Sequence, residues 1–102
     1  MKLIYAESAR QDIHEIYVTI SARGSTSAAG RVENHIRHRC EMLAEFPFAS
    51  SKTDEVRMRR AALVRYPYAI FFRVDPDRAA VEIARVVHGA SLKDLDVVPD
   101  SD

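Results

Sequence analysis

Residues 56–90 carry a run of cations that could bind anionic groups. Seven are arginines and three residues of this stretch are acidic, so seven minus three leaves a local excess of four positive charges. The arginines are Arg57, Arg59, Arg60, Arg65, Arg73, Arg78 and Arg85. A guanidinium group can hold a carboxylate or a phosphate through two parallel hydrogen bonds. Such a stretch is typical of a solvated strand face or of an interaction surface, and the exclusive use of arginine favours the interaction surface.

Other residues that could do chemistry lack the partners that their chemistry needs. His35 and His38 stand one helical turn apart and could hold a metal with His14, but no cysteine cluster accompanies them. Exposed helix histidines are therefore the favoured interpretation. Cys40 is the single cysteine and cannot form an internal disulfide. No serine lies in a Gly-x-Ser-x-Gly turn, so we expect no metal and no cofactor.

The composition is that of one soluble domain. The chain has 102 residues, 47% hydrophobic and 29% charged, with a formal net charge of zero. We expect one core within residues 1–102, with residues 92–102 as an acidic mobile tail. No apolar run approaches the roughly 18 residues of a membrane helix, and acidic residues interrupt the first twenty positions. We therefore expect a cytoplasmic protein without membrane contact.

A first amphipathic helix is predicted near the start of the chain. Ser8 and Gln11 have the spacing of a capping box that opens a helix, and Gly24 ends it. The apolar residues at helical spacing are Ile13, Ile16, Tyr17 and Ile20.

A second amphipathic helix is predicted after Gly24. Ser25 or Ser27 can cap it, and Pro47 ends it. Its apolar stripe is formed by Ala29, Val32, Ile36, Cys40 and Leu43. Two such helices joined by a few residues should form an antiparallel hairpin that needs another layer to cover its apolar stripes.

That other layer is predicted to be a sheet. Residues 68–74 and 81–87 alternate in strand fashion, and residues 75–78, Asp-Pro-Asp-Arg, supply the turn of a hairpin. Residues 56–65 are predicted as a further strand and residues 2–5 as a short first strand. The predicted fold class is α+β in the order β-α-α-β-β-β, with an N-terminal helical hairpin packed on a small antiparallel sheet.

One register of the hairpin satisfies both faces of the sheet. It pairs Val74 with Val81, Phe72 with Ile83 on the core side, and Arg73 with Glu82 on the other face. The same alternation, continued along the second strand, sets Arg85 and Val87 in phase with Ile83. Phe71 and Phe72 should point to opposite faces.

Residues 62–89, ALVRYPYAIFFRVDPDRAAVEIARVVHG, resemble the most characteristic stretch of the RelE/ParE toxin superfamily. The positions in step with the family pattern are Arg65, Pro67, Tyr68, Ile70, Phe72, Arg73, Val74, Ile83, Val86, His88 and Gly89. The segments similar to the family's first helix and to the end of its second helix are Ser8-Ala9-x-x-Asp12-Ile13-x-x-Ile16 and Leu43-Ala44-Glu45-Phe46-Pro47. The resemblance covers nearly the whole chain and implies a helical hairpin on a small antiparallel sheet. It also implies a cognate antitoxin whose flexible segment masks the working surface in a toxin–antitoxin hetero-oligomer.

The segment after the histidine departs from the family pattern. Many relatives continue with Gly-x-Arg-Asp, whereas this chain has His88-Gly89-Ala90-Ser91-Leu92-Lys93-Asp94. The missing arginine keeps a third interpretation open, an inert relative that retains antitoxin binding without toxicity.

The resemblance implies one of two functional classes, because RelE-like members cut messenger RNA in the ribosome and ParE-like members bind DNA gyrase. Cleavage of RNA through its 2′-hydroxyl needs an acid or base, and cations that stabilise the phosphorane. His88 is the candidate acid or base, and Arg65, Arg73 and Arg85 are the candidate phosphate clamps. Alternatively, His88 only closes a strand end and Arg73 only pairs with Glu82. Arg85 has the alternative of covering apolar surface with its stem.

The zero net charge favours the ParE-like class, since a nuclease acting at the ribosome competes for a dense phosphate surface. We therefore expect a growth-inhibiting toxin that binds DNA gyrase, with a ribosome-dependent endoribonuclease acting on mRNA as the alternative. The residues expected to contact the target or the antitoxin are Arg57, Arg59, Arg65, Phe71, Arg73, Arg85 and His88. His88 and Arg85 are catalytic candidates only if the protein is a nuclease.

Overall fold

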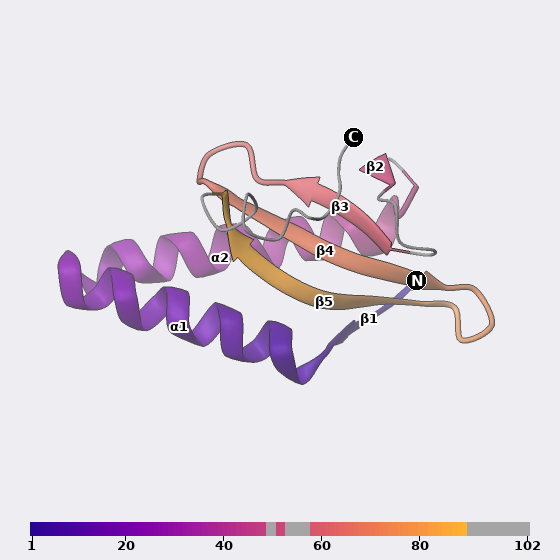
Figure 1. Cartoon of the computed structure of the whole chain (residues 1–102), viewed down its shortest axis with the longest axis horizontal. Helices are drawn as coiled ribbons and strands as arrows, with labels where there is room; N and C mark the ends of the chain where they lie inside the picture. Colours follow the sequence, from indigo (N-terminus) through magenta and orange to yellow (C-terminus); the bar gives the residue numbers. More distant parts are fainter. Residues whose placement is uncertain (49–50, 53–57, 90–102) are drawn as a thin grey trace.

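The computed structural model of the chain describes residues 1–48, 51–52 and 58–89. Its elements are β1 (Lys2–Tyr5), α1 (Glu7–Arg23), α2 (Thr26–Glu45), β2 (Ser51–Lys52), β3 (Met58–Ala62), β4 (Tyr68–Asp75) and β5 (Ala80–His88), shown in Figure 1. Arg57 and the predicted acidic tail, residues 92–102, lie outside the described residues. No helix among the described residues is long and apolar enough to cross a membrane.

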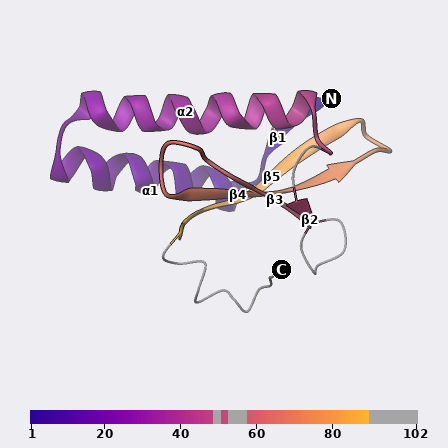
Figure 2. The ribbon, with the colours of Figure 1, turned by 90° about the horizontal axis from the view of Figure 1, so that it is seen from above.

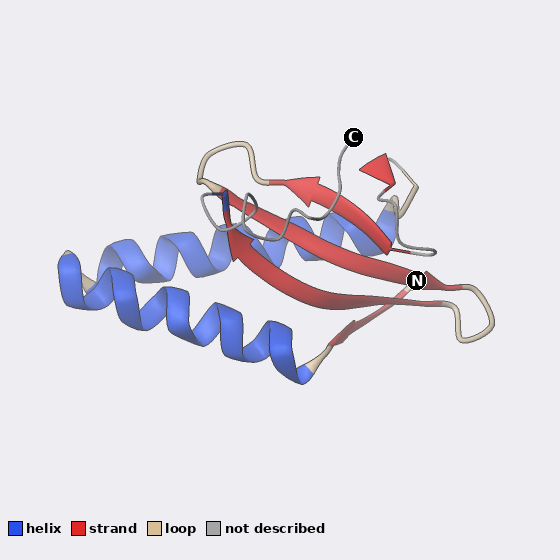
Figure 3. Cartoon of the chain, in the orientation of Figure 1, coloured by secondary structure: helices blue, strands red, loops and turns tan. Residues whose placement is uncertain are grey.

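The helices and strands form two layers. The strands make one sheet in the order β1-β5-β4-β3-β2, and the α1–α2 hairpin packs on one face of it (Figures 2 and 3). The predicted α+β fold is therefore confirmed. One detail was not foreseen: β1 runs parallel to β5, whereas the other neighbours are antiparallel.

Three of the four helix ends predicted from the sequence are confirmed. Ser25 caps α2, its hydroxyl accepting a hydrogen bond from the Ala28 N–H at 3.0 Å. Gly24 ends α1, α2 stops at Glu45, and the predicted break before Pro47 is confirmed. The predicted capping box at Ser8 is wrong, because α1 already begins at Glu7 without a side-chain cap. Ser8 is instead used in a contact with β5.

The core lies between the hairpin and the sheet. The predicted α2 stripe is fully confirmed, since all five of its residues are buried. The largest fully buried side chains are Phe72, Ile36, Leu43, Ile70, Ile83, Val81 and Cys40. Burial of this apolar area is the dominant favourable term in folding. The helix stripe and the alternating strands therefore stabilise one another, as their periods predict.

The strand predicted over residues 56–65 is shorter in the structure, where it is β3. It ends at Ala62, because the chain turns back and the Leu63 N–H donates to the Tyr68 carbonyl at 2.9 Å. A short strand before it, β2, was not predicted and pairs with Arg59 and Arg60. The predicted β4–β5 register is confirmed, with Phe72 opposite Ile83.

A β-bulge interrupts β5 after Ile83. Phe72 pairs with Ile83 but Phe71 pairs with Arg85, so Ala84 is the extra residue. The predicted continuous alternation is therefore wrong beyond Ile83. Without the bulge Arg85 would point into the core; with it, Arg85 is exposed and Val86 joins the buried cluster.

Candidate functional site

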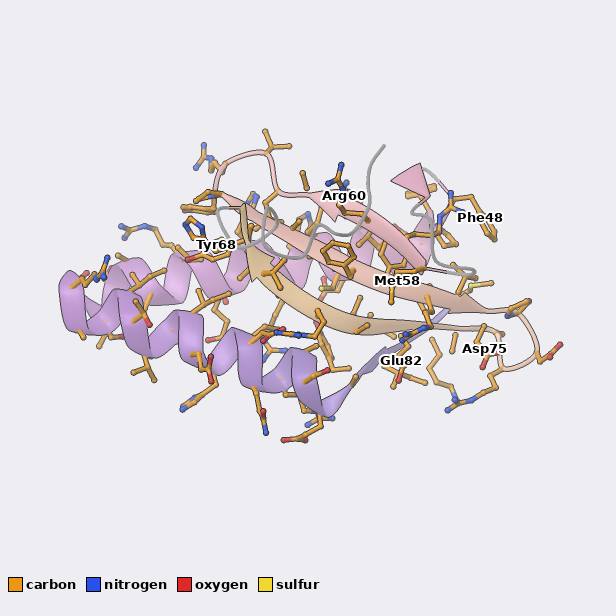
Figure 4. The ribbon with its side chains drawn as sticks, in the orientation of Figure 1. Phe48, Met58, Arg60, Tyr68, Asp75 and Glu82 are labelled. Carbon is orange, nitrogen blue, oxygen red and sulfur yellow. The ribbon has the colours of Figure 1, made fainter. Side chains whose placement is uncertain are left out.

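The face of the sheet that carries no described helix holds three of the seven predicted arginines, Arg60, Arg73 and Arg85. The pairing registers place three rows across strands β5, β4 and β3. These rows are Glu82, Arg73 and Met58; then Arg85, Phe71 and Arg60; then Val87, Ala69 and Ala62. We call this surface the helix-free face. Figure 4 labels Met58, Arg60 and Glu82 on it.

Phe71 lies at the centre of the helix-free face. It forms a small second apolar cluster with Ala69, Val87 and Met58, whereas Phe72 is in the main core. The prediction that the two rings point to opposite faces is therefore confirmed. Phe71, which was expected to contact the target or the antitoxin, is only 8% exposed and is buried among its neighbours on this face.

Arg85 is held by an acidic residue of α1 that sequence reasoning did not assign. Its Nε donates to Asp12 Oδ2 at 2.7 Å and its Nη2 donates to Asp12 Oδ1 at 3.0 Å. The same carboxylate accepts the Val86 N–H at 2.8 Å. The hydrogen bond to Asp12 is the main reason why the pKa of Arg85 is raised above its usual value. Bidentate pairing of this kind is geometrically specific.

Ser8 completes this contact one helical turn before Asp12. Its hydroxyl donates to the Ala84 carbonyl at 2.7 Å, next to the bulge. Ser8 and Asp12 thus hold the backbone on either side of Arg85. The signal that could have found them is their four-residue spacing beside the buried Ala9 and Ile13, which places both on the side of α1 that faces the sheet.

Arg73 also has an acidic neighbour on the helix-free face. Its Nη1 lies 3.7 Å from Glu82 Oε1, and both side chains are 40% exposed. The ion pair anticipated from the register is therefore present. Two arginines of this face, Arg73 and Arg85, therefore form ion pairs with carboxylates of the same chain.

Arg59 has a different position, beside the end of α2. Its guanidinium carbon lies 5.3 Å from the centre of the Phe48 ring, and its Nη2 donates to the Phe48 carbonyl at 3.4 Å. This cation–π contact joins β3 to the segment that follows α2. Arg59 is therefore placed to stabilise this connection.

Tyr68 lies at the opposite end of the sheet from Phe48 (Figure 4), and His88 is its partner across β4 and β5. Arg65 is exposed in the loop between β3 and β4. The His88 ring meets the Tyr68 ring edge to face, with centroids 5.3 Å apart. Burial raises the pKa of Tyr68 above its usual value. His88 thus ends β5 packed against an aromatic ring.

Gly89 fixes the position of this end of β5. Its N–H donates to the Pro67 carbonyl at 2.6 Å, and a Cβ atom at Gly89 would lie 3.4 Å from that oxygen. A Cβ at this distance would be in van der Waals contact with the Pro67 carbonyl. The backbone hydrogen bond from Gly89 joins the end of β5 to the residue before β4.

The predicted site residues are not brought to one place. Phe71, Arg73 and Arg85 share the helix-free face, Arg59 is at one end, and Arg65 and His88 are at the other. Within the described residues, no group of three histidine, cysteine, aspartate or glutamate side chains could hold a metal. In the part of the chain that the structure describes, these candidates are therefore spread over one face and both ends of the sheet.

Comparison with known proteins identifies the family. Residues 3–92 match the family model described as the ParE toxin of the type II toxin–antitoxin system parDE. No curated protein matches the chain.

Solved structures that share the fold include three from toxin–antitoxin systems. The chromosomal ParDE system of P. aeruginosa is 21% identical with a TM-score of 0.77, covering 86% of this chain and 95% of that one. The E. coli RelBE complex is 17% identical with a TM-score of 0.64, covering 85% and 94%. The RelBE2 complex of Mycobacterium tuberculosis is 20% identical with a TM-score of 0.64, covering 85% and 95%. The match over nearly the whole sequence, on this helical hairpin and sheet, means that the chain belongs to the ParE toxin family of type II toxin–antitoxin systems.

Proposed function

We propose that the protein inhibits growth in the cytoplasm by binding DNA gyrase, and that a cognate antitoxin neutralises it in a toxin–antitoxin hetero-oligomer. Membership of the ParE family supports this class of toxin. The higher TM-score with the ParDE structure than with the two RelBE structures agrees with it.

The pairing of Arg85 with Asp12 is the observation that carries the proposal. A ribonuclease needs cations available to the phosphate beside its acid or base. The Nε–Nη2 edge of Arg85 is already occupied by the Asp12 carboxylate, whose negative charge lies beside the remaining donors. His88 lies against Tyr68, at the end of the sheet, and Arg65 is in an exposed loop nearby. This distribution supports binding over phosphate chemistry.

The antitoxin partner is supported by the relatives, since the ParDE and RelBE structures are those of toxin–antitoxin systems. We propose that the antitoxin covers the arginine-bearing strands. Arg60 is exposed on β3, and Val64 is 94% exposed in the loop beside Arg65. Arginines next to apolar side chains are enriched at protein interfaces.

Two assays on the purified chain test the proposal. Supercoiling by gyrase and cleavage of messenger RNA in a translating extract are measured in parallel, with and without the antitoxin. We expect inhibition of supercoiling, relief by the antitoxin, and intact messages. Message cleavage with normal supercoiling would instead assign the RelE-like ribonuclease class.

A histidine substitution separates the two classes further. His88→Ala should change gyrase inhibition only modestly, whereas a nuclease that used His88 would lose its activity. His38→Ala is the matched control, because His38 is 71% exposed on α2. If induction of the chain without antitoxin leaves growth unaffected, the inert interpretation replaces both classes.

A further inference from the structure

Two carboxylates are built into the arginine-bearing surface of the sheet. Asp12 is only 12% exposed and accepts three hydrogen bonds, two from Arg85 and one from the Val86 N–H. Glu82 lies 3.7 Å from Arg73 on the neighbouring row of the helix-free face. Both acids are therefore placed where they cancel the charge of an arginine of the same surface.

The geometry at Arg85 opposes phosphate binding in a specific way. A guanidinium binds phosphate most strongly through a pair of parallel N–H groups. In Arg85 the Nε and Nη2 donors already hold Asp12, while the side chain remains 51% exposed. A phosphate that approached the remaining donors would also meet the negative charge of Asp12. The Nη1–Nη2 edge of Arg85 keeps two parallel donors, so it is the adjacent negative charge of Asp12 that opposes an anion at this exposed side chain.

The bulge at Ala84 explains why Arg85 needs a partner on this surface. It moves Arg85 out of the core and into the same row as Phe71 and Arg60. An arginine moved to this surface without a partner would add to a basic patch. The chain instead brings Asp12 across from α1, 73 residues away in sequence, to pair with it.

We propose that Asp12 and Glu82 are specificity-determining residues that withhold Arg85 and Arg73 from phosphate, so that the helix-free face accepts a protein segment and rejects nucleic acid. This inference rests on the proposed function, in which both the target and the antitoxin are bound as proteins. The formal net charge of zero agrees with it, because nucleic-acid binders gain affinity from a basic excess that releases counterions.

Replacing the two acids by their amides tests the inference directly. Asp12→Asn keeps an oxygen that can accept the Val86 N–H, and Glu82→Gln keeps the length of the side chain. The double variant raises the formal net charge from zero to plus two. The matched control is Glu33→Gln with Glu41→Gln, which gives the same charge on α2. Glu33 there pairs with Arg37 at 2.9 Å.

Binding of a fluorescent oligouridylate is measured by anisotropy between about 50 and 200 mM salt, where phosphate contacts weaken strongly. We expect the double variant to bind at least about tenfold more tightly than the control at the lower salt concentration. Its salt slope should be steeper by about 1.4, at roughly 0.7 for each of two phosphate contacts to a single strand. Glu82→Gln alone should give about half of that change in slope, and circular dichroism confirms that each variant is folded.

The outcomes are distinguishable. An equal gain in affinity for the oligouridylate in the control would mean that net charge alone matters. An unchanged affinity in the double variant would mean that the two ion pairs do not prevent phosphate binding. Either result overturns the inference. Neither result affects the gyrase assay on the unmodified chain. Tight binding of the oligonucleotide by the unmodified chain at the higher salt would contradict the inference, whereas the proposed function fails only if supercoiling by gyrase is unaffected.

Discussion

Removal of the Asp12 carboxylate should destabilise the fold through the backbone of β5 more than through the ion pair. In Asp12→Ala the partly buried Val86 N–H loses its acceptor, which costs about 1–3 kcal/mol. The lost pair with Arg85 adds only about 0–1 kcal/mol, because that arginine is 51% exposed and solvent screens it. The expected loss in free energy of unfolding is therefore roughly 1–4 kcal/mol.

Two companion variants separate the contributions. Asp12→Asn keeps an acceptor for the Val86 N–H. Its free energy of unfolding should therefore fall by only about 0–1 kcal/mol, the contribution of the ion pair. Ser8→Ala removes the hydrogen bond to the Ala84 carbonyl and leaves the ion pair of Arg85 in place. Its free energy of unfolding should fall by about 0.5–1.5 kcal/mol.

Equilibrium unfolding in urea, followed by circular dichroism, measures all three variants. Equal losses for Asp12→Ala and Asp12→Asn would refute this reasoning, since they would assign the stability to the charge. A loss below about 0.5 kcal/mol for Asp12→Ala would mean that the contact with Val86 contributes little, against the cost expected for an unpaired amide.

Three further predictions concern the turn, a helix cap and alkaline pH. Ala79 has φ of 50°, so Ala79→Gly should raise the free energy of unfolding by up to about 1 kcal/mol in urea titrations, and a decrease would argue against strain there. Ser25→Ala should lower it by about 0.5–2 kcal/mol in the same titrations, whereas no change would mean that the cap at Ala28 is not needed. Burial raises the pKa of Cys40 from 9.0 to about 11 and that of Tyr5 from 10.0 to about 12. Because both folded values are raised, their stabilising effect is complete below pH 9 and is lost as the pH rises through about 11 to 12. Unfolding at increasing pH should show this decline, and Cys40→Ala should reduce it; an equally steep decline in the variant would exclude Cys40 as its source.

The helices and the β4–β5 hairpin could be predicted because their signals are local. The α2 stripe follows a period of 3.6 residues, and residues 75–78 carry turn chemistry, so the register around Phe72 followed from burial of one face. The pairing of β1 with β5 could not be predicted in this way, because it joins segments nearly eighty residues apart.

The candidate site was less accessible to sequence reasoning. The arginines were visible from their type, but their surroundings depend on tertiary contacts. Arg85 changes sides because of one extra residue at Ala84, and its partner Asp12 is on another element. Ser8 has the spacing of a helix cap but bonds to β5, because the strand offers it a carbonyl that needs a donor. Side-chain type predicts what a residue can bind, whereas the packing decides what it does bind.

The contact of α1 with β5 also bears on self-association. β1 pairs with the outer edge of β5 only as far as Ile83. An unpaired strand edge is a template on which another polypeptide can add a strand and begin to aggregate. Beyond Ile83, Ser8 and Asp12 occupy the Ala84 carbonyl and the Val86 amide, which an incoming strand would need. A second molecule in a concentrated solution therefore meets a helix at this margin, and edge-to-edge polymerisation is disfavoured there.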